Sequence, residues 1–162
     1  KFNYDYNKYK YKSFSYLNRG SDERQYCSPK FNLPFCTLCR TKFGDYKEYH
    51  TSLDNLNFIS SNALEKSYLM IKSLVNIIEA NKIYVSNIFG EPFLTKYNLK
   101  EEISGYNKPL NLNTKAIIDL ITYSNGKNDL IDISNYIKKD FKYLCEITKK
   151  IEKLKIIKSI NK

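Results

Sequence analysis

The sequence has no tryptophan and little histidine, methionine, arginine, glycine, proline or cysteine. Its 162 residues include one His, one Met, 5 Gly, 4 Pro and 4 Cys. Four cysteines are too few for a disulfide scaffold in a chain of this length, which indicates a reducing compartment. The 42% of hydrophobic residues is enough for a real core, so the composition excludes a disordered tail.

Long apolar runs are also missing. No stretch approaches the ~18 apolar residues that cross a bilayer, and the N-terminus is polar and Tyr-rich, unlike a secretory signal. We therefore predict no membrane association and a cytoplasmic location. Because the chain begins at Lys1 and its single methionine is Met70, we also expect it to be a piece of a longer protein.

Negative charge is scarce relative to positive charge, and the formal net charge is +10. Clustered lysines gain affinity for phosphates through counterion release, so nucleic-acid binding is a hypothesis. Arginine, which makes bidentate contacts to bases and phosphates, is scarce. The chain is equally heavy in Asn, Ile and Tyr, so a general compositional bias is an alternative source of the charge.

The N-terminal half shows weak strand signals and one strong helix signal. Alternating aromatic residues predict a strand over residues 10–17, and a short strand is expected around residues 35–40 of an irregular segment over 27–49. Gly20 is expected to permit a turn with positive φ. A helix begins near Ser60 or Ser61 and ends near residues 81–82. Its apolar residues recur at helical spacing and are predicted to face the core: Leu64, Tyr68, Ile71, Leu74, Val75 and Ile78.

Helical periodicity returns in three pieces towards the C-terminus. We predict helices over residues 114–124, 129–138 and 140–154, a turn at Asn125-Gly126-Lys127, and a short strand within residues 155–160. This order is typical of a winged helix-turn-helix. The predicted organisation is residues 1–98 as one domain, 99–110 as a linker and 111–162 as the winged-helix-like domain.

The residues that chemistry favours lie between Arg19 and Leu56. They form a polar run from Asp22 to Gln25 and a group of potential ligands, which are Cys27, Cys36, Cys39, His50 and Asp54. A carboxylate in the polar run can hold a free α-amino group, and an arginine can hold a carboxylate. The alternative for the run is a salt-bridged surface turn.

Two stretches carry a family resemblance. They are Arg19-Gly20-Ser21-Asp22-Glu23-Arg24-Gln25-Tyr26-Cys27-Ser28-Pro29 and Glu48-Tyr49-His50-Thr51-Ser52-Leu53-Asp54-Asn55-Leu56. With Asn32-Leu33-Pro34 and Arg40-Thr41 between them, they resemble the C-terminal part of bacterial aminopeptidase-like proteins related to the di-zinc aminopeptidases. The resemblance implies an α/β fold: the C-terminal portion of a zinc-exopeptidase-like three-layer α/β/α domain, followed by a small winged helix-turn-helix domain.

The resemblance also implies roles for individual residues. In that group the segment Tyr-His-Thr-x-x-Asp supplies the last metal-binding histidine, which here would be His50. From the residues themselves, we expect Asp54 or a backbone group to orient the imidazole. Glu23 stands where the wider family often has histidine. Asp22, Glu23, Arg24 and Gln25 are the predicted substrate-binding residues, with Glu23 and Arg24 favoured among them.

The same resemblance implies a hydrolase of peptide or amide bonds that holds two zinc ions when complete. The other metal ligands and the general base lie N-terminal in the family, so we expect no catalytic residue and no activity in this chain alone. The implied partners are the missing N-terminal part of the catalytic domain and a peptide-like substrate. Fold analogy does not by itself specify the reaction.

Two alternatives remain. Cys27, Cys36, Cys39 and His50 offer the ligand types of a closed structural zinc site, against which stand plain packed thiols. The lysines on the last predicted helix suggest a second hypothesis, in which the chain is a non-enzymatic winged-helix module that binds nucleic acid or docks a protein. An exposed core face would also favour association into a homo-oligomer.

Overall fold

The computed structural model describes residues 11–99 and 112–160. It divides into two compact units, Tyr9–Ser73 and a unit that includes Leu74–Lys162, and each unit is considered by itself. Helix α3 (Ser61–Ala80) crosses the division. Among the described residues, no helix has the length and hydrophobicity that a bilayer span requires.

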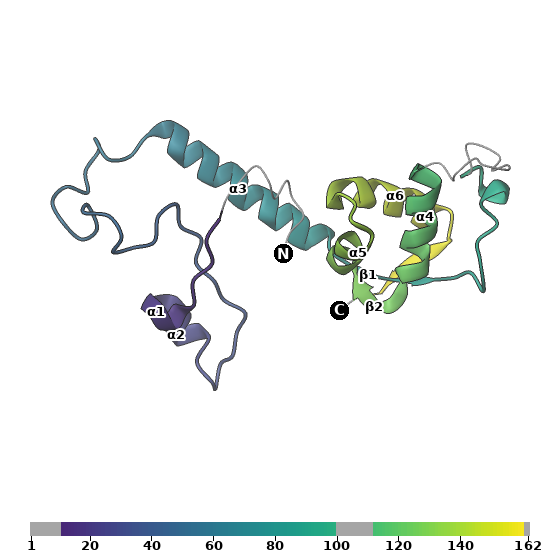
Figure 1. The fold of residues 1–162 in the computed structure, drawn as a ribbon, viewed down its shortest axis with the longest axis horizontal. Coiled ribbons are helices and arrows are strands. Elements are labelled where there is room, and N and C mark those ends of the chain that lie inside the picture. The colour runs from purple at the N-terminus through teal and green to yellow at the C-terminus, as the bar shows by residue number, and fades with distance from the viewer. Residues whose placement is uncertain (1–10, 100–111, 161–162) are drawn as a thin grey trace. The chain divides into compact units, whose positions relative to one another are not determined.

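The C-terminal unit combines a small antiparallel sheet with three helices (Figure 1). Its strands are β1 (Ile83–Ser86), β2 (Asn125–Asp129) and β3 (Ile157–Ile160), in the order β2-β1-β3. Its helices are α4 (Leu112–Tyr123), α5 (Leu130–Ile137) and α6 (Phe141–Lys153), and the 3-10 helix η1 (Leu94–Tyr97) precedes them. Strand β1 pairs with a strand on each side, so it holds the sheet together.

One apolar core fills this unit. The buried residues come from every helix and include Ile77, Tyr84, Leu94, Leu99, Ile117, Leu120, Leu130, Ile133, Leu144, Ile147, Ile151 and Ile157. The amphipathic spacing of α5 and α6 puts these side chains on one face of each helix. Burial of the shared face, rather than local propensity, therefore assembles the unit.

Capping contacts fix where the helices begin. The Asp129 carboxylate accepts a hydrogen bond from the Asp132 backbone N–H, and the Asp132 carboxylate accepts one from the Asp129 backbone N–H. This pair of hydrogen bonds is a capping box at the start of α5. Asn81, just after α3, donates to the Asp129 carboxylate at 2.9 Å and accepts from the Ile131 backbone N–H at 3.0 Å. The start of α5 is thereby tied to the end of α3.

The predicted mixed α/β class is confirmed, and this unit has the helices and the terminal strand of the predicted winged helix-turn-helix. Two local features differ from prediction. Strand β1 was not predicted, although alternating Ile83 and Val85 are typical of a strand. The predicted turn at Asn125-Gly126-Lys127 lies inside β2, where the Asn125 side chain accepts from the Lys127 backbone and Gly126 has φ of 79°.

The position of β1 bears on the predicted domain boundary. A linker over residues 99–110 would place β1 in the preceding domain, yet β1 is the central strand of this sheet. The hydrogen-bonded unit therefore already includes residues 83–86. Residues 100–110 of the predicted linker lie outside the described residues.

The N-terminal unit has little regular structure. It contains two short helices, α1 (Tyr16–Arg19) and α2 (Asp22–Tyr26), followed by a long irregular segment that leads to α3 (Figure 1). The strand predicted over residues 10–17 is wrong for the described part, because residues 11–15 are irregular and α1 follows; residue 10 and the aromatic residues before it lie outside the description. The strand predicted around residues 35–40 is also wrong, because this segment is irregular and no strand among the described residues pairs with it.

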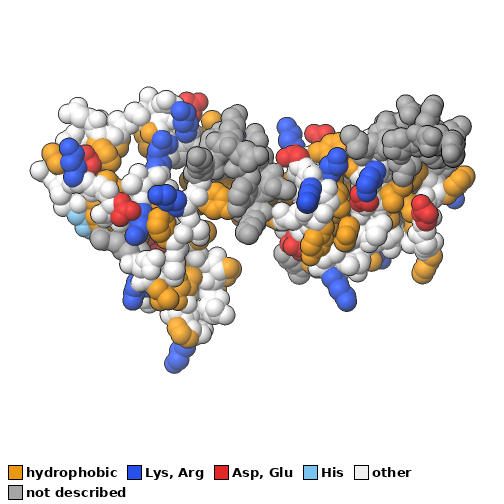
Figure 2. Space-filling model, viewed as in Figure 1, with side chains coloured by type: hydrophobic (Ala, Val, Ile, Leu, Met, Phe, Trp, Pro, Cys, Tyr) orange, Lys and Arg blue, Asp and Glu red, His pale blue; other side chains and the backbone are white. Residues whose placement is uncertain are grey.

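Apolar side chains of this unit are exposed. Among the described side chains of residues 11–73, the one that is buried is the carboxylate-bearing Glu23. Figure 2 shows hydrophobic side chains reaching the surface in many places. The helix over residues 61–80 is confirmed, but most of its predicted core stripe is not core: Leu64, Tyr68, Ile71, Val75 and Ile78 are each between 50% and 61% exposed. The reason is that no described element covers that side of α3.

Replacement of Asn81 by alanine tests the tie between α3 and α5. Asn81→Ala leaves the Ile131 N–H without its partner, so we expect a loss of about 1–3 kcal/mol in the free energy of unfolding. Urea titration of the full chain, followed by far-UV circular dichroism, measures it. Asn76→Ala, at an exposed position of α3, is the control and should stay within about 0.5 kcal/mol. Equal stabilities for the two variants would contradict the role of Asn81.

Candidate functional site

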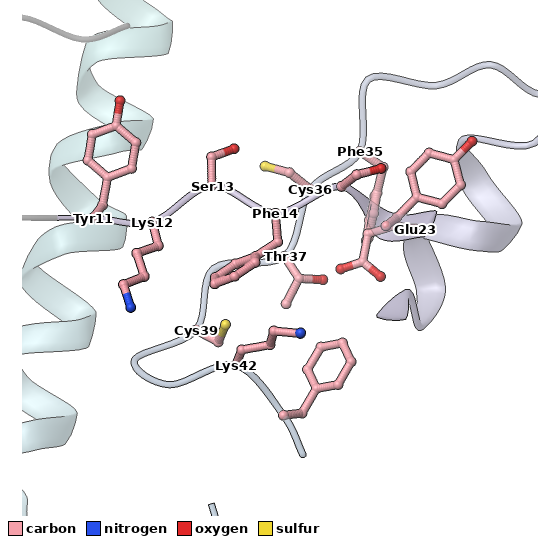
Figure 3. A pocket seen from close by; sticks show the side chains of 13 residues that line it. Tyr11, Lys12, Ser13, Phe14, Glu23, Phe35, Cys36, Thr37, Cys39 and Lys42 are labelled. Atoms are coloured by element: carbon pink, nitrogen blue, oxygen red, sulfur yellow. The ribbon is translucent and has the colours of Figure 1, made fainter. Parts of the chain in front are cut away.

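A pocket of about 350 Å³ lies within the N-terminal unit (Figure 3). Its walls come from three segments: the stretch that leads into the first residue of α1, helix α2, and the irregular chain after α2. They supply Tyr11, Lys12, Ser13, Phe14, Ser15, Tyr16, Glu23, Phe35, Cys36, Thr37, Cys39, Lys42 and Phe43. Five of these thirteen residues are aromatic, and the others include one carboxylate, two amines and two thiols.

Glu23 supplies the one carboxylate in the pocket wall. Its side chain is 8% exposed, and one oxygen accepts a hydrogen bond from the Ser21 backbone N–H at 2.7 Å. Figure 3 shows the carboxylate directed toward the Thr37 hydroxyl, which also donates to it. The Thr37 hydrogen bond, with help from the Ser21 and Glu23 backbone N–H groups, holds the pKa of Glu23 below its ordinary value of 4.5. Glu23 is thus a buried carboxylate that stays ionised.

The other predicted substrate-binding residues do not join Glu23 in the pocket. Asp22, Arg24 and Gln25 are exposed and are absent from the pocket wall. The reason is helical geometry, since successive residues of α2 point about 100° apart. The structure therefore separates the four-residue polar run into one pocket residue and three surface residues.

Gly20 allows α1 and α2 to meet closely, and the reason differs from the predicted one. Its φ is −97°, a value open to any residue. A Cβ at this position would lie 2.8 Å from the Tyr16 carbonyl oxygen and 2.4 Å from the Arg24 Cγ. Close approach of the backbone, rather than positive φ, requires glycine here.

His50 occupies a strained backbone position on a different turn of the same unit. It has φ of 55°, a region that non-glycine residues seldom adopt and that recurs at functional sites. The imidazole is exposed and stacks on the Tyr49 ring, with ring centroids 4.0 Å apart. Tyr49 in turn stacks on Phe43 at 6.0 Å, and Phe43 lines the pocket. A short series of rings thus connects the Glu23 pocket to His50.

Threonine organises the turn after His50. The Thr51 hydroxyl donates to the Lys47 and Glu48 carbonyls, and it accepts from the Leu53 backbone N–H at 3.3 Å. The Asp54 backbone N–H donates to the Thr51 carbonyl at 3.1 Å. The Asp54 side chain makes no hydrogen bond to His50 in the described structure, so its predicted orienting role is not part of this arrangement.

The potential metal ligands are dispersed. Within residues 11–99 and 112–160, no three His, Cys, Asp or Glu side chains gather closely enough to hold a metal ion. The Cys27 thiol donates hydrogen bonds to the Leu33 and Phe35 carbonyls, while Cys36 and Cys39 line the pocket. The cysteines and His50 therefore do not form the closed four-ligand site. His50 fits a metal only as one ligand among others that another segment would supply.

Several pocket residues could not be found from sequence. Phe14, Thr37 and Lys42 are far apart along the chain and belong to no motif. Lys42 Nζ lies 5.0 Å from the centroid of the Phe14 ring, a cation–π contact across two segments. The one sequence signal near the pocket is the density of aromatic residues before Gly20, and its alternation predicts a strand rather than a pocket wall.

Comparisons with known proteins divide the chain into two matched regions. Residues 3–81 match a family described as Domain of unknown function (DUF4910). Residues 82–159 match a winged helix-turn-helix family, in agreement with the fold of the C-terminal unit. The junction between the two matches falls at the end of α3, immediately before β1.

Longer proteins resemble most of this chain. A Clostridium acetobutylicum protein, provisionally named as a polysaccharide biosynthesis protein with an aminopeptidase-like domain, is 34% identical over 142 residues, which are 85% of this chain and 32% of that protein. A crystal structure from the same organism, provisionally named as a peptidase, matches with a TM-score of 0.63 and 26% identity. The match covers 86% of this chain and 30% of that one. The chain thus spans about a third of the length of each.

Titration of Glu23 tests the wall of the pocket. Because its pKa is lowered, the folded state favours the ionised carboxylate, and the stabilising contribution is present above pH 4.5 and lost as pH falls through the folded pKa. Thr37→Val removes the hydrogen bond that contributes most to lowering the pKa of Glu23, so this pKa should rise towards 4.5. Carboxyl-carbon NMR of ¹³C-labelled glutamate measures it. Thr41→Val, an exposed neighbour outside the pocket wall, is the control. An unchanged Glu23 titration in Thr37→Val would refute the hydrogen bond.

Proposed function

We propose that this chain is the C-terminal portion of a zinc-dependent aminopeptidase-like hydrolase that acts on peptide or amide bonds. The observation that carries the proposal is a series of contacts that joins three features: a buried, ionised Glu23, a pocket with five aromatic residues in its wall, and a strained His50. This arrangement lies within a chain that is similar, over more than four fifths of its length, to proteins named as aminopeptidase-like or as a peptidase. The chain contributes part of the site, and the remainder of the enzyme contributes the rest.

His50 would provide one of the zinc ligands. Its imidazole is exposed, and stacking on Tyr49 restricts the orientation of the ring. Zinc, when bound, supplies Lewis-acid polarisation of the scissile carbonyl. The further ligands and the general base would come from the two thirds of the enzyme that correspond to the unmatched part of the relatives.

Glu23 would hold the free amino group of the substrate. A carboxylate that stays ionised at neutral pH attracts an ammonium group, and the Ser21 N–H and Thr37 hydroxyl keep this carboxylate in place. Phe14, Phe35 and Phe43 offer apolar surface for the adjoining side chain of the substrate. Recognition of the amino terminus is what distinguishes an aminopeptidase from other amide hydrolases.

A second function is favoured by one observation on α6. Lys142, Lys149, Lys150 and Lys153 are exposed on one side of this helix, and among the described residues none of them pairs with an acidic side chain. Unpaired lysines on the last helix of a helix-turn-helix suit the phosphates of nucleic acid. The winged-helix unit could bind nucleic acid while the rest of the chain serves the hydrolase.

Substitution of His50 tests the hydrolase. We would replace the matched third of the Clostridium acetobutylicum protein with this chain and measure zinc per polypeptide by elemental mass spectrometry, together with hydrolysis of amino-acid anilides. His50→Ala should lose bound zinc and activity, and Asp54→Ala should weaken zinc binding roughly 10–100-fold if Asp54 orients the ligand in the complete site.

Ser52→Ala changes an exposed side chain in the same turn and is the matched control. It should retain zinc and activity. Unchanged zinc content in His50→Ala would disprove the ligand role of His50.

The salt dependence of binding to duplex DNA tests the second function. In a plot of log affinity against log salt, the slope should fall by about one for each phosphate-contacting lysine removed, here Lys149→Ala and Lys153→Ala. Lys115→Ala is the control, because Lys115 lies on α4 and pairs with Asp119 at 2.8 Å. Absence of binding at low salt, or equal slopes in all variants, would exclude nucleic acid as the partner of α6.

A further inference from the structure

Helix α3 carries a continuous apolar stripe that nothing in the described structure covers. We call Leu64, Tyr68, Ile71, Val75 and Ile78 the α3 stripe. The intervals along it are four, three, four and three residues, which place all five side chains on one face of a helix. No charged residue interrupts it.

The α3 stripe is the open edge of a wider apolar arc. Its neighbour on the helix surface is a second row, in which Ile77 is buried in the core and Leu74 is half-buried. The charged residues Glu65, Lys72 and Glu79 form the next row on the other flank of the α3 stripe, where Lys72 Nζ lies 5.8 Å from the centroid of the Tyr68 ring. A helix that buries one edge of its apolar arc and leaves the other edge bare lies at the margin of an incomplete core. Single exposed apolar residues are ordinary, but a five-residue row marks a contact surface.

We propose that the α3 stripe packs against the remainder of the aminopeptidase-like domain, so that α3 is a covering helix of that domain. This inference rests on the proposed function and names the partner of the same site. The partner surface is a broad, uncharged apolar face of the kind that a β-sheet presents to a helix. The relatives contain enough additional chain to form it, since about two thirds of their length lies outside the match.

The neighbouring surface favours this partner over a second copy of the chain. Leu64, Tyr68 and Ile71 belong to the same compact unit as the irregular segment before α3, whose apolar side chains are also exposed. That segment includes Leu53, Leu56, Phe58 and Ile59, which are at least 48% exposed. A helix-to-helix dimer would cover the α3 stripe alone and leave this segment bare, whereas one large apolar partner can cover both.

Cysteine labelling measures whether the α3 stripe is covered. We would introduce Val75→Cys, a nearly isosteric change in the stripe, and as control Asn76→Cys, which is exposed on the polar side of the same helix. Maleimide labelling of each site, resolved from the native cysteines by peptide mass spectrometry, would be followed in the isolated 162-residue chain and in the chimera with the Clostridium acetobutylicum protein.

In the isolated chain both cysteines should label rapidly, at rates independent of protein concentration. In the chimera the cysteine at position 75 should label at least about tenfold more slowly, because labelling then requires local opening, while the cysteine at position 76 stays fast. Fast labelling of position 75 in a monodisperse chimera overturns the proposal. Aggregation of the chimera also contradicts it, because the α3 stripe would then not be covered by the rest of the domain.

Slow, concentration-dependent labelling of position 75 in the isolated chain would identify a second copy as the occupant and also overturn the proposal. The same experiment distinguishes failure of the hydrolase proposal from failure of the packing proposal. A chimera that protects position 75 but binds no zinc supports the packing of α3 and contradicts the metal role of His50.

Discussion

Among the described residues, the buried apolar side chains lie in one part of the chain, and the rest of the structure depends on that limit. The core runs from Ile77 to Ile157 and is closed by the sheet β2-β1-β3 and helices α4 to α6. Residues 11–73 have no comparable core among the described side chains. Because apolar burial is the main favourable term in folding, the N-terminal unit needs surface from elsewhere to reach the same stability.

Helix α3 extends from the N-terminal unit, which has no comparable core among its described side chains, into the unit that contains the apolar core. Ile77 at its C-terminal end packs into the core, and Asn81 links that end to the start of α5. Towards its N-terminal end, Arg40 donates to the Ala63 carbonyl at 3.3 Å, and the apolar side chains are exposed. One continuous helix therefore begins in the unit with the pocket and ends in the winged-helix unit, and it leaves the α3 stripe exposed.

The candidate site is also only partly organised by contacts within the described residues. Hydrogen bonds within the chain are sufficient to bury and ionise Glu23, and ring stacking is sufficient to restrict His50. Neither device completes a metal centre, because zinc requires several ligands held at once. In the function we propose, the remaining ligands would come from polypeptide outside this chain.

The sequence by itself determined the elements whose signals are local. The three C-terminal helices and the strand β3 follow from apolar periodicity, and the prominence of Glu23 and His50 follows from the density of reactive side chains between Arg19 and Leu56. Only the tertiary structure decided which of them meet. It separated Glu23 from Asp22, Arg24 and Gln25, placed β1 at the centre of the sheet, and exposed the α3 stripe that periodicity had assigned to the core. The physical reason is that periodicity records which face of a helix is apolar, whereas burial depends on what other chain lies against that face.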